Sequence, residues 1–147
     1  MIQDAIHQAF RRAIEKSWDT IYVGADIHGV MLIPTYENGG KMEFYPRAEN
    51  IMKYLSSRKD IVLILWTCSK QDEIRDYLDF FKERGIEFEY VNENQGVGND
   101  NYGDYTKKPY MNLLLDDKAG FDPKTDWEVV DRLFTIYNKI PGKRKTP

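Results

Sequence analysis

Apolar side chains recur three or four positions apart in several stretches of the chain, with charged residues at the positions between them. In residues 2–18 this spacing puts the apolar residues on one face, which predicts an amphipathic helix. The same spacing predicts three further helices, over residues 46–58, 69–85 and 124–139. Pro46 favours the first turn of the second helix, and Gly85 favours the end of the third.

Uninterrupted apolar runs predict strands between these helices. Residues 20–26, 60–66 and 110–117 form such runs, which are typical of strands buried on both faces of a sheet. Residues 86–92 alternate in polarity, and residues 31–45 have two apolar arms around a Glu-Asn-Gly-Gly centre that predicts a β-hairpin. Because strands alternate with helices, we expect an α/β fold, in which helices sandwich a Rossmann-like parallel sheet and an extra helix comes first.

A chain of 147 residues is long enough for one domain with its own core. We divide it into an N-terminal amphipathic helix (1–19), a main domain (20–140) and a flexible basic tail (141–147). The net charge of -3 gives no electrostatic reason to expect a nucleic acid or an anionic membrane as partner. No apolar run approaches the roughly 20 residues that a membrane-spanning helix needs.

Cys68 is the single cysteine of the chain, which excludes an internal disulfide and is typical of a reducing compartment. Charged residues are spread through the N-terminal segment, which therefore lacks the apolar block of a secretory signal. We expect a cytoplasmic protein, in which Cys68 is a small buried residue.

Chemically reactive side chains come at the ends of the predicted strands. Asp26 ends the first, Thr67-Cys68-Ser69 follow the second, and Asp116-Asp117 end the last, with Lys108 just before it. In a parallel sheet these ends share one edge, where ligands bind. Three carboxylates at one edge repel each other unless a cation lies between them, and oxygen ligands favour Mg²⁺. Thr67, the backbone amides of the following turn and Lys108 can then bind phosphate oxygens, and a carboxylate can attack phosphorus.

Three segments together resemble the motifs of the haloacid dehalogenase-like (HAD) superfamily of phosphohydrolases. "VGADIHGVM" (23–31) resembles the first motif, "LILWTCS" (63–69) the second, and "KKPYMNLLLDD" (107–117) the third and fourth together. The resemblance covers roughly residues 20–140 and implies a HAD-like catalytic domain that transfers a phosphoryl group to Asp26 and then hydrolyses the product. It also implies Mg²⁺ held by Asp26, the backbone carbonyl of His28, Asp116 and Asp117. The phosphate group is then expected on Thr67, Cys68, Ser69 and Lys108, with Lys108 favoured over Lys107.

His28 is the main departure from this pattern. The family has an Asp at this position, which protonates the leaving oxygen and later activates water, and Val30 replaces the usual Thr. A histidine can do acid–base work at neutral pH, which makes His28 a candidate catalytic residue beside Asp26 and Lys108. It can equally mark a lost acid, or be a turn histidine with no proton to move. Thr67 likewise has a structural alternative, as the cap of the next helix.

Many members of the family carry a cap domain over the site, and this chain has no room for one. Residues 31–45 and 92–107 are both short, so we expect an open site. Such a site takes either a large substrate or a small phosphorylated one, enclosed in a homo-oligomer that forms through the N-terminal helix. The aromatics Tyr36, Phe44, Tyr45, Tyr102 and Tyr105 can stack on a base or sugar, or can be ordinary surface residues.

Three functions fit these observations. The first is a Mg²⁺-dependent phosphatase of the small capless type, for a nucleotide or another small phosphomonoester. The second is a degenerate relative that binds metal and a phosphoryl ligand as a binding or regulatory module. The third is a phosphatase for nucleic-acid ends, which the net charge of -3 and the lack of a basic stripe disfavour.

Overall fold

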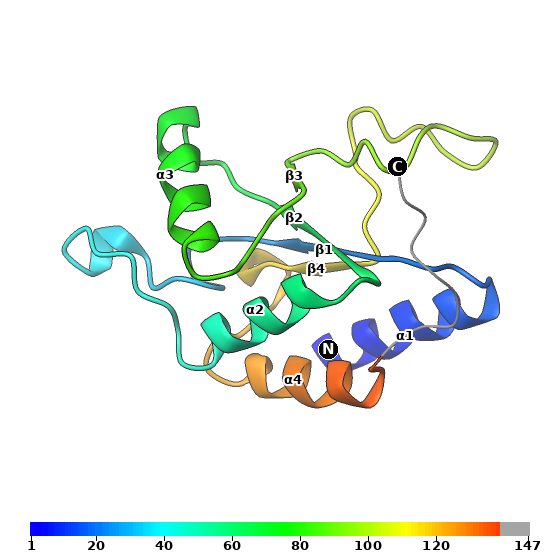
Figure 1. Cartoon of the computed structure of the whole chain (residues 1–147), viewed down its shortest axis with the longest axis horizontal. Coiled ribbons are helices and arrows are strands. Elements are labelled where there is room, and N and C mark those ends of the chain that lie inside the picture. Colours follow the sequence, from blue (N-terminus) through cyan, green and yellow to red (C-terminus); the bar gives the residue numbers. More distant parts are fainter. Residues whose placement is uncertain (139–147) are drawn as a thin grey trace.

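The computed structural model describes residues 1–138 and confirms the predicted α/β fold. Its elements are α1 (Ile2–Glu15), β1 (Ile21–Ala25), η1 (Thr35–Glu37), α2 (Ala48–Ser57), β2 (Ile61–Leu65), α3 (Gln71–Lys82), β3 (Tyr90–Val91), β4 (Leu113–Leu115), η2 (Asp117–Ala119) and α4 (Asp126–Ile136). The strands form one all-parallel sheet in the order β3-β2-β1-β4 (Figure 1). The predicted basic tail lies outside the described residues.

The register of the sheet brings the ends of three strands level with one another. Ala25, the last residue of β1, pairs with Leu65 of β2 on one side and with Leu115 of β4 on the other. The ladder continues one step further, because the Asp26 N–H donates to the Leu115 carbonyl at 2.9 Å. The residues that follow β1 and β4 therefore start from neighbouring points of one edge.

The main core lies between the sheet and the helices α1, α2 and α4, which share one face of it (Figure 1). Residues Phe10 of α1 and Phe134 of α4 are fully buried and meet edge to face, with ring centroids 5.1 Å apart. Burial of each such ring contributes about 1.5–3 kcal/mol. The apolar face of α1 is thus used inside its own chain, although Ile14 near its end stays exposed.

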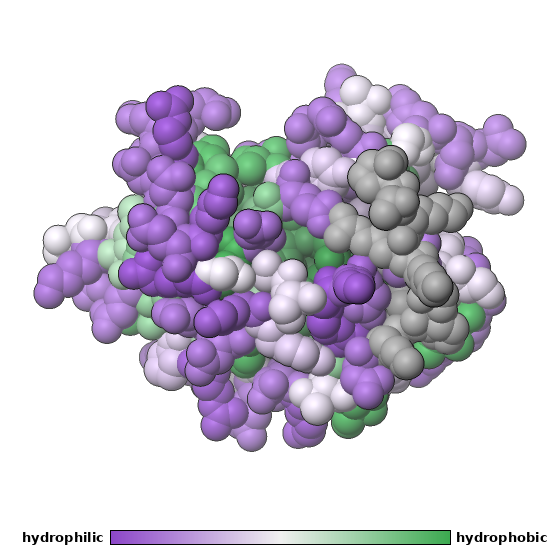
Figure 2. Space-filling view, viewed as in Figure 1, coloured by the Kyte–Doolittle hydropathy of each residue, from purple (hydrophilic) through white to green (hydrophobic). Residues whose placement is uncertain are grey.

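The other face of the sheet has a thinner cover. Helix α3 lies over one end of it and the segment 92–112, which contains no helix or regular strand, over the other (Figure 1). Figure 2 shows apolar residues gathered in the middle of this face, between a polar α3 and a polar loop. No helix of residues 1–138 has the length and apolar character to cross a membrane.

The predicted hairpin over residues 31–45 is wrong as a regular two-stranded ladder. Its arms meet at a single antiparallel bridge, between Leu32 and Phe44, which consists of two backbone hydrogen bonds, one on each side of this pair. Pro34 explains why the ladder stops, because it has no N–H to donate and its ring fixes φ. The short helix η1 begins directly after it.

The other elements appear where they are expected and are shorter than predicted. Of residues 86–92 only Tyr90–Val91 pair, because β3 is an edge strand with a partner on one side alone. Of residues 110–117 only Leu113–Leu115 are strand, and helices α1 and α4 end a few residues before the predicted ends.

Candidate functional site

Three carboxylates meet at the carboxyl edge of the sheet. Asp26 follows β1, Asp116 and Asp117 follow β4, and one oxygen from each lies within 4.8 Å of the other two. The parallel pairing of β1 with β4 explains this convergence, since neighbouring strands lie about 4.8 Å apart. The structure therefore brings together the three acids that the sequence placed at strand ends.

The pKa of Asp26 is raised by its burial and by the two neighbouring carboxylates. Burial, together with the charges of Asp116 and Asp117, raises this pKa from 3.8 to about 6, and the Ile27 N–H that the carboxyl accepts at 2.8 Å acts in the opposite direction. A carboxyl so disfavoured as an anion gains most from a nearby cation. The cluster could hold a metal ion, and its oxygen-only donor set fits a hard cation such as Mg²⁺.

The backbone fixes the direction of the two acids after β4. The Lys118 N–H donates to Asp116 Oδ1 at 2.9 Å and to Asp117 Oδ1 at 3.0 Å, in the first turn of η2. On the opposite side, Gly29 has a φ of +79°, and a Cβ on it would lie 2.8 Å from Asp117 Oδ2. Gly29 thus leaves room for Asp117, a role that the motif itself does not reveal.

His28 turns its ring toward α3. Its Nε2 lies 2.7 Å from the hydroxyl of Tyr77, and the two rings meet edge to face at 5.3 Å. Burial lowers the pKa of His28, while Glu73 acts in the opposite direction, so the neutral imidazole is favoured at pH 7. Tyr77 was not predicted as a site residue, because its position on α3 is that of an ordinary core residue.

Thr67 stands in a hydrogen-bonded turn after β2. Its Oγ1 accepts the Ser69 N–H at 3.1 Å and its hydroxyl donates to Ser69 Oγ at 2.9 Å. Helix α3 begins only at Gln71 and has no side-chain cap, so Thr67 does not serve as its cap. The N–H of Cys68 forms no hydrogen bond within residues 1–138.

Asn92 clamps this turn from the end of β3. Its Oδ1 accepts the Thr67 N–H and its Nδ2 donates to the Thr67 carbonyl, both at 2.8 Å. Asn92 adopts a positive φ of 55°, which asparagine tolerates better than most residues. This functional candidate was also missed, although an asparagine directly after a predicted strand is the same kind of signal as Asp26.

Cys68 and Lys108 differ in how the structure places them. Cys68 is exposed, so the prediction that it is buried is wrong; the turn after β2 directs it to solvent rather than into the core. Lys108 is also exposed and lines a cavity of about 500 Å³ together with Trp66, the residue before Thr67. Within residues 1–138, no hydrogen bond or ion pair joins Lys108 to the three carboxylates.

Comparisons with known proteins show the fold and no activity. No protein-family model matches the sequence, and no curated protein matches it. Among solved structures, the chain is similar to a conserved protein from Bacteroides thetaiotaomicron, with a TM-score of 0.61 and 20% identity, over 87% of this chain and 99% of that one. The two proteins thus share an α/β fold along nearly their whole lengths.

Proposed function

We propose that the protein is a Mg²⁺-dependent phosphomonoester hydrolase that works through an aspartyl-phosphate on Asp26. The observation that carries the proposal is the meeting of Asp26, Asp116 and Asp117 within 4.8 Å at the carboxyl edge of a parallel sheet. Phosphoryl transfer through a carboxylate requires a nucleophile, further acids that hold a metal, and hydrogen-bond donors for the phosphate group. The cluster supplies the first two, and the turn after β2 supplies the donors.

Asp26, Asp116 and Asp117 would hold the metal, with the backbone carbonyl of His28 as a further oxygen ligand. When bound, Mg²⁺ neutralises these carboxylates and stabilises negative charge on phosphoryl oxygens. The raised pKa of Asp26, about 6, supports this role, because a cation returns the group to the anionic form that attacks phosphorus.

The turn after β2 would bind the phosphate group. The Cys68 N–H is available to a phosphate oxygen, and such an oxygen can replace Ser69 Oγ as the acceptor of the Thr67 hydroxyl. The Lys108 ammonium would add a positive charge to this set, and its place in the same cavity as Trp66, the residue before Thr67, supports this role.

Two displacements at phosphorus complete the reaction. In the first, an Asp26 carboxylate oxygen forms a bond to phosphorus, and the bond to the leaving oxygen breaks with its electron pair. In the second, a water oxygen forms a bond to the same phosphorus, the bond from phosphorus to the Asp26 oxygen breaks with its electron pair, and inorganic phosphate leaves. If Nε2–H of His28 donates to Tyr77, the Nδ1 lone pair is free to accept the proton of that water.

The lowered pKa of His28 makes it a weak acid for the first displacement. Substrates whose leaving groups are stable as anions suffer least from this, so aryl and acyl phosphates should react faster than alkyl phosphates. The same observation favours the second candidate function, a degenerate relative that binds metal and a phosphoryl ligand without turnover.

The substrate we propose is a small phosphomonoester, a nucleotide among them, which a second copy of the chain would enclose in this open site. Neither residues 31–45 nor residues 92–112 form a separate cap domain. We place the protein in the cytoplasm, and we keep the homo-oligomer through α1 as a proposal, with Ile14 as the apolar residue left exposed on that helix.

Phosphate release from a panel of aryl, acyl and alkyl phosphates tests the proposal, with and without Mg²⁺. We expect release that needs Mg²⁺ and is lost in Asp26→Asn. Asp131→Asn, which removes an exposed carboxylate from α4, is the matched control and should behave as the wild type. If the wild type releases phosphate from every substrate no faster than Asp26→Asn does, the hydrolase proposal is overturned. The second candidate function, a module that binds metal and a phosphoryl ligand, would then be favoured.

A further inference from the structure

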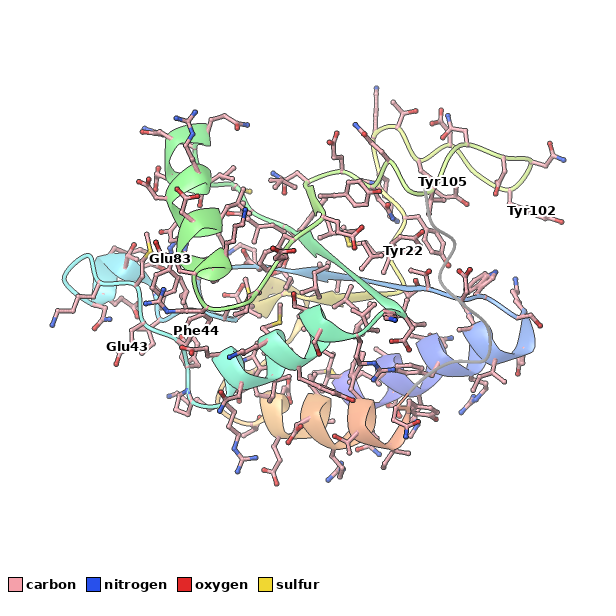
Figure 3. The ribbon with its side chains drawn as sticks, in the orientation of Figure 1. Tyr22, Glu43, Phe44, Glu83, Tyr102 and Tyr105 are labelled. Atoms are coloured by element: carbon pink, nitrogen blue, oxygen red, sulfur yellow. The ribbon has the colours of Figure 1, made fainter. Side chains whose placement is uncertain are left out.

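A second cavity, of about 720 Å³, lies at the amino end of the strands. Tyr22 at the start of β1 and Asn112 before β4 line it, whereas the three carboxylates follow the other ends of the same strands. Asp26 comes four positions after Tyr22 along β1 and its extension, which corresponds to about 13 Å. Figure 3 shows Tyr22 and Tyr105 well apart from Phe44, which belongs to the segment after Asp26. The cavity is therefore separate from the three carboxylates, although Tyr105, Tyr110 and Asn112 also line the cavity that contains Lys108.

Aromatic rings form one wall of this cavity. The ring of Tyr110 lies edge to face with those of Trp18, Tyr22 and Tyr105, with centroids 6.2, 6.3 and 5.6 Å away. All four side chains are half-buried, so each is held by packing while part of it stays accessible from the cavity. Rings held in this way stack on a flat ligand at a low cost in conformational entropy.

Positive charge comes from the end of α1, with Arg12 in its last turn and Lys16 directly after it. Arg12 and Lys16 lie one helical turn apart, line the cavity and are exposed, and neither forms an ion pair within residues 1–138. Lys16 Nζ lies 5.4 Å from the centre of the Trp18 ring, so the charge and the aromatic wall are adjacent. Two cations beside such a wall are complementary to a phosphate group attached to a ring system.

Two carboxylates also line the cavity, and they can accept hydrogen bonds from the hydroxyl groups of a sugar. Asp19 Oδ1 accepts the Thr20 hydroxyl at 3.0 Å, and Asp100 Oδ1 accepts the N–H groups of Tyr102 and Gly103. Carboxylates that already accept neutral donors can also accept sugar hydroxyls. Stacking rings, cations and hydroxyl acceptors thus line one cavity.

We propose that this cavity binds a mononucleotide, with its base against the tyrosines, its phosphate on Arg12 and Lys16 and its sugar hydroxyls toward Asp19. A volume of about 720 Å³ lies within the range of small-molecule sites, about 300–1,000 Å³. The proposal does not depend on chemistry at Asp26, because none of the three clustered acids lines the cavity.

Calorimetric titration with the four ribonucleoside 5′-monophosphates tests it, in the full-length Asp26→Asn protein with EDTA present. These conditions remove the metal and prevent turnover, so binding there is separate from the proposed hydrolase. We expect saturable binding that Arg12→Gln weakens by about tenfold and Tyr105→Ala by a similar factor. Arg11→Gln, which removes the neighbouring charge outside the cavity, should leave the affinity unchanged.

Ligands that carry only one part of the nucleotide test whether the whole cavity is used. Adenosine and inorganic phosphate should each bind more weakly than adenosine monophosphate, because each contacts one part of the cavity. Circular dichroism establishes that each variant is folded, and Lys16→Gln replaces Arg12→Gln if that protein is not. The proposal is overturned by the absence of binding for all four nucleotides, or by binding that the cavity variants leave unchanged.

Discussion

Asp117 Oδ2 lies only 2.8 Å from the position that a Cβ on residue 29 would occupy, and Gly29 leaves this space empty. Gly29 comes three residues after Asp26 and Asp117 two residues after β4, so this contact joins the two halves of the acidic cluster. The space over a single glycine therefore helps to decide whether the three carboxylates can share one ion.

Replacement of that glycine should separate folding from metal binding. Gly29→Ala places an L side chain at a φ of +79°, which costs about 1–2 kcal/mol, and pushes Asp117 away from Asp26. Gly39→Ala is the matched control, because Gly39 has a φ of +63° and nothing within 4 Å of its Cβ position. Both variants should melt earlier than the wild type, but only Gly29→Ala should lose the rise in melting temperature on addition of Mg²⁺. An equal Mg²⁺ response in the two would contradict this account of Gly29.

Asp26 should make the metal-free protein less stable at neutral than at acidic pH. The folded pKa of about 6 lies above the ordinary aspartate pKa of 3.8, so the folded state binds more protons between these values and stability falls as pH rises through them. Full conversion of the shift gives about 3 kcal/mol, and solvent screening of this half-exposed group reduces the expected effect to about 1 kcal/mol.

Urea unfolding in EDTA at several pH values measures this effect. Asp26→Asn should be more stable than the wild type above pH 6, and the difference should disappear near pH 4. Asp131→Asn should show no such dependence. If Asp26→Asn raises the free energy of unfolding by the same amount at every pH, the effect comes from packing and not from charge.

His28→Asp should restore the missing acid of the proposed hydrolase. The carboxyl can protonate the leaving oxygen, which is typically worth about 10²- to 10⁴-fold in rate, and alkyl phosphates should gain most. Phosphate release under saturating Mg²⁺ is the measurement. A variant that binds Mg²⁺ normally and stays inactive favours the degenerate binding module instead.

Loss of the Asn92 clamp should weaken phosphate binding without removing the metal site. Asn92→Gly keeps the positive φ of 55° without strain and deletes both hydrogen bonds to Thr67. We expect a higher KM for substrate or a weaker affinity for inorganic phosphate, by about tenfold, with an unchanged Mg²⁺ response. Asn50→Ala, which removes an exposed amide from α2 and keeps a helix-forming residue there, is the control.

The sequence predicted the strands of the sheet and the residues at their ends best. Apolar runs located three strands, alternating polarity located the fourth, and helical spacing located the helices between them. Acids at strand ends predicted the cluster, because parallel pairing leaves these ends little freedom. It was less informative where side chains from distant elements meet. Nothing in the spacing of α3 shows that Tyr77 reaches His28, and nothing local shows that Asn92 reaches Thr67.

Composition misled in two places for identifiable reasons. Pro34 stops the expected hairpin ladder, although the Gly-Gly centre of that segment favours a turn. Cys68 has the size and polarity of a core residue, yet it occupies a turn, and the position decides its exposure.

The exposure of Cys68 also makes the molecule convenient to study. It is the chain's single thiol, and it follows Thr67 directly. A maleimide fluorophore or a spin label can therefore be attached at one defined position without any prior mutagenesis. Such a label would report on the turn after β2 from within it, so that ligand arrival there could be followed in real time as a change in emission or in mobility.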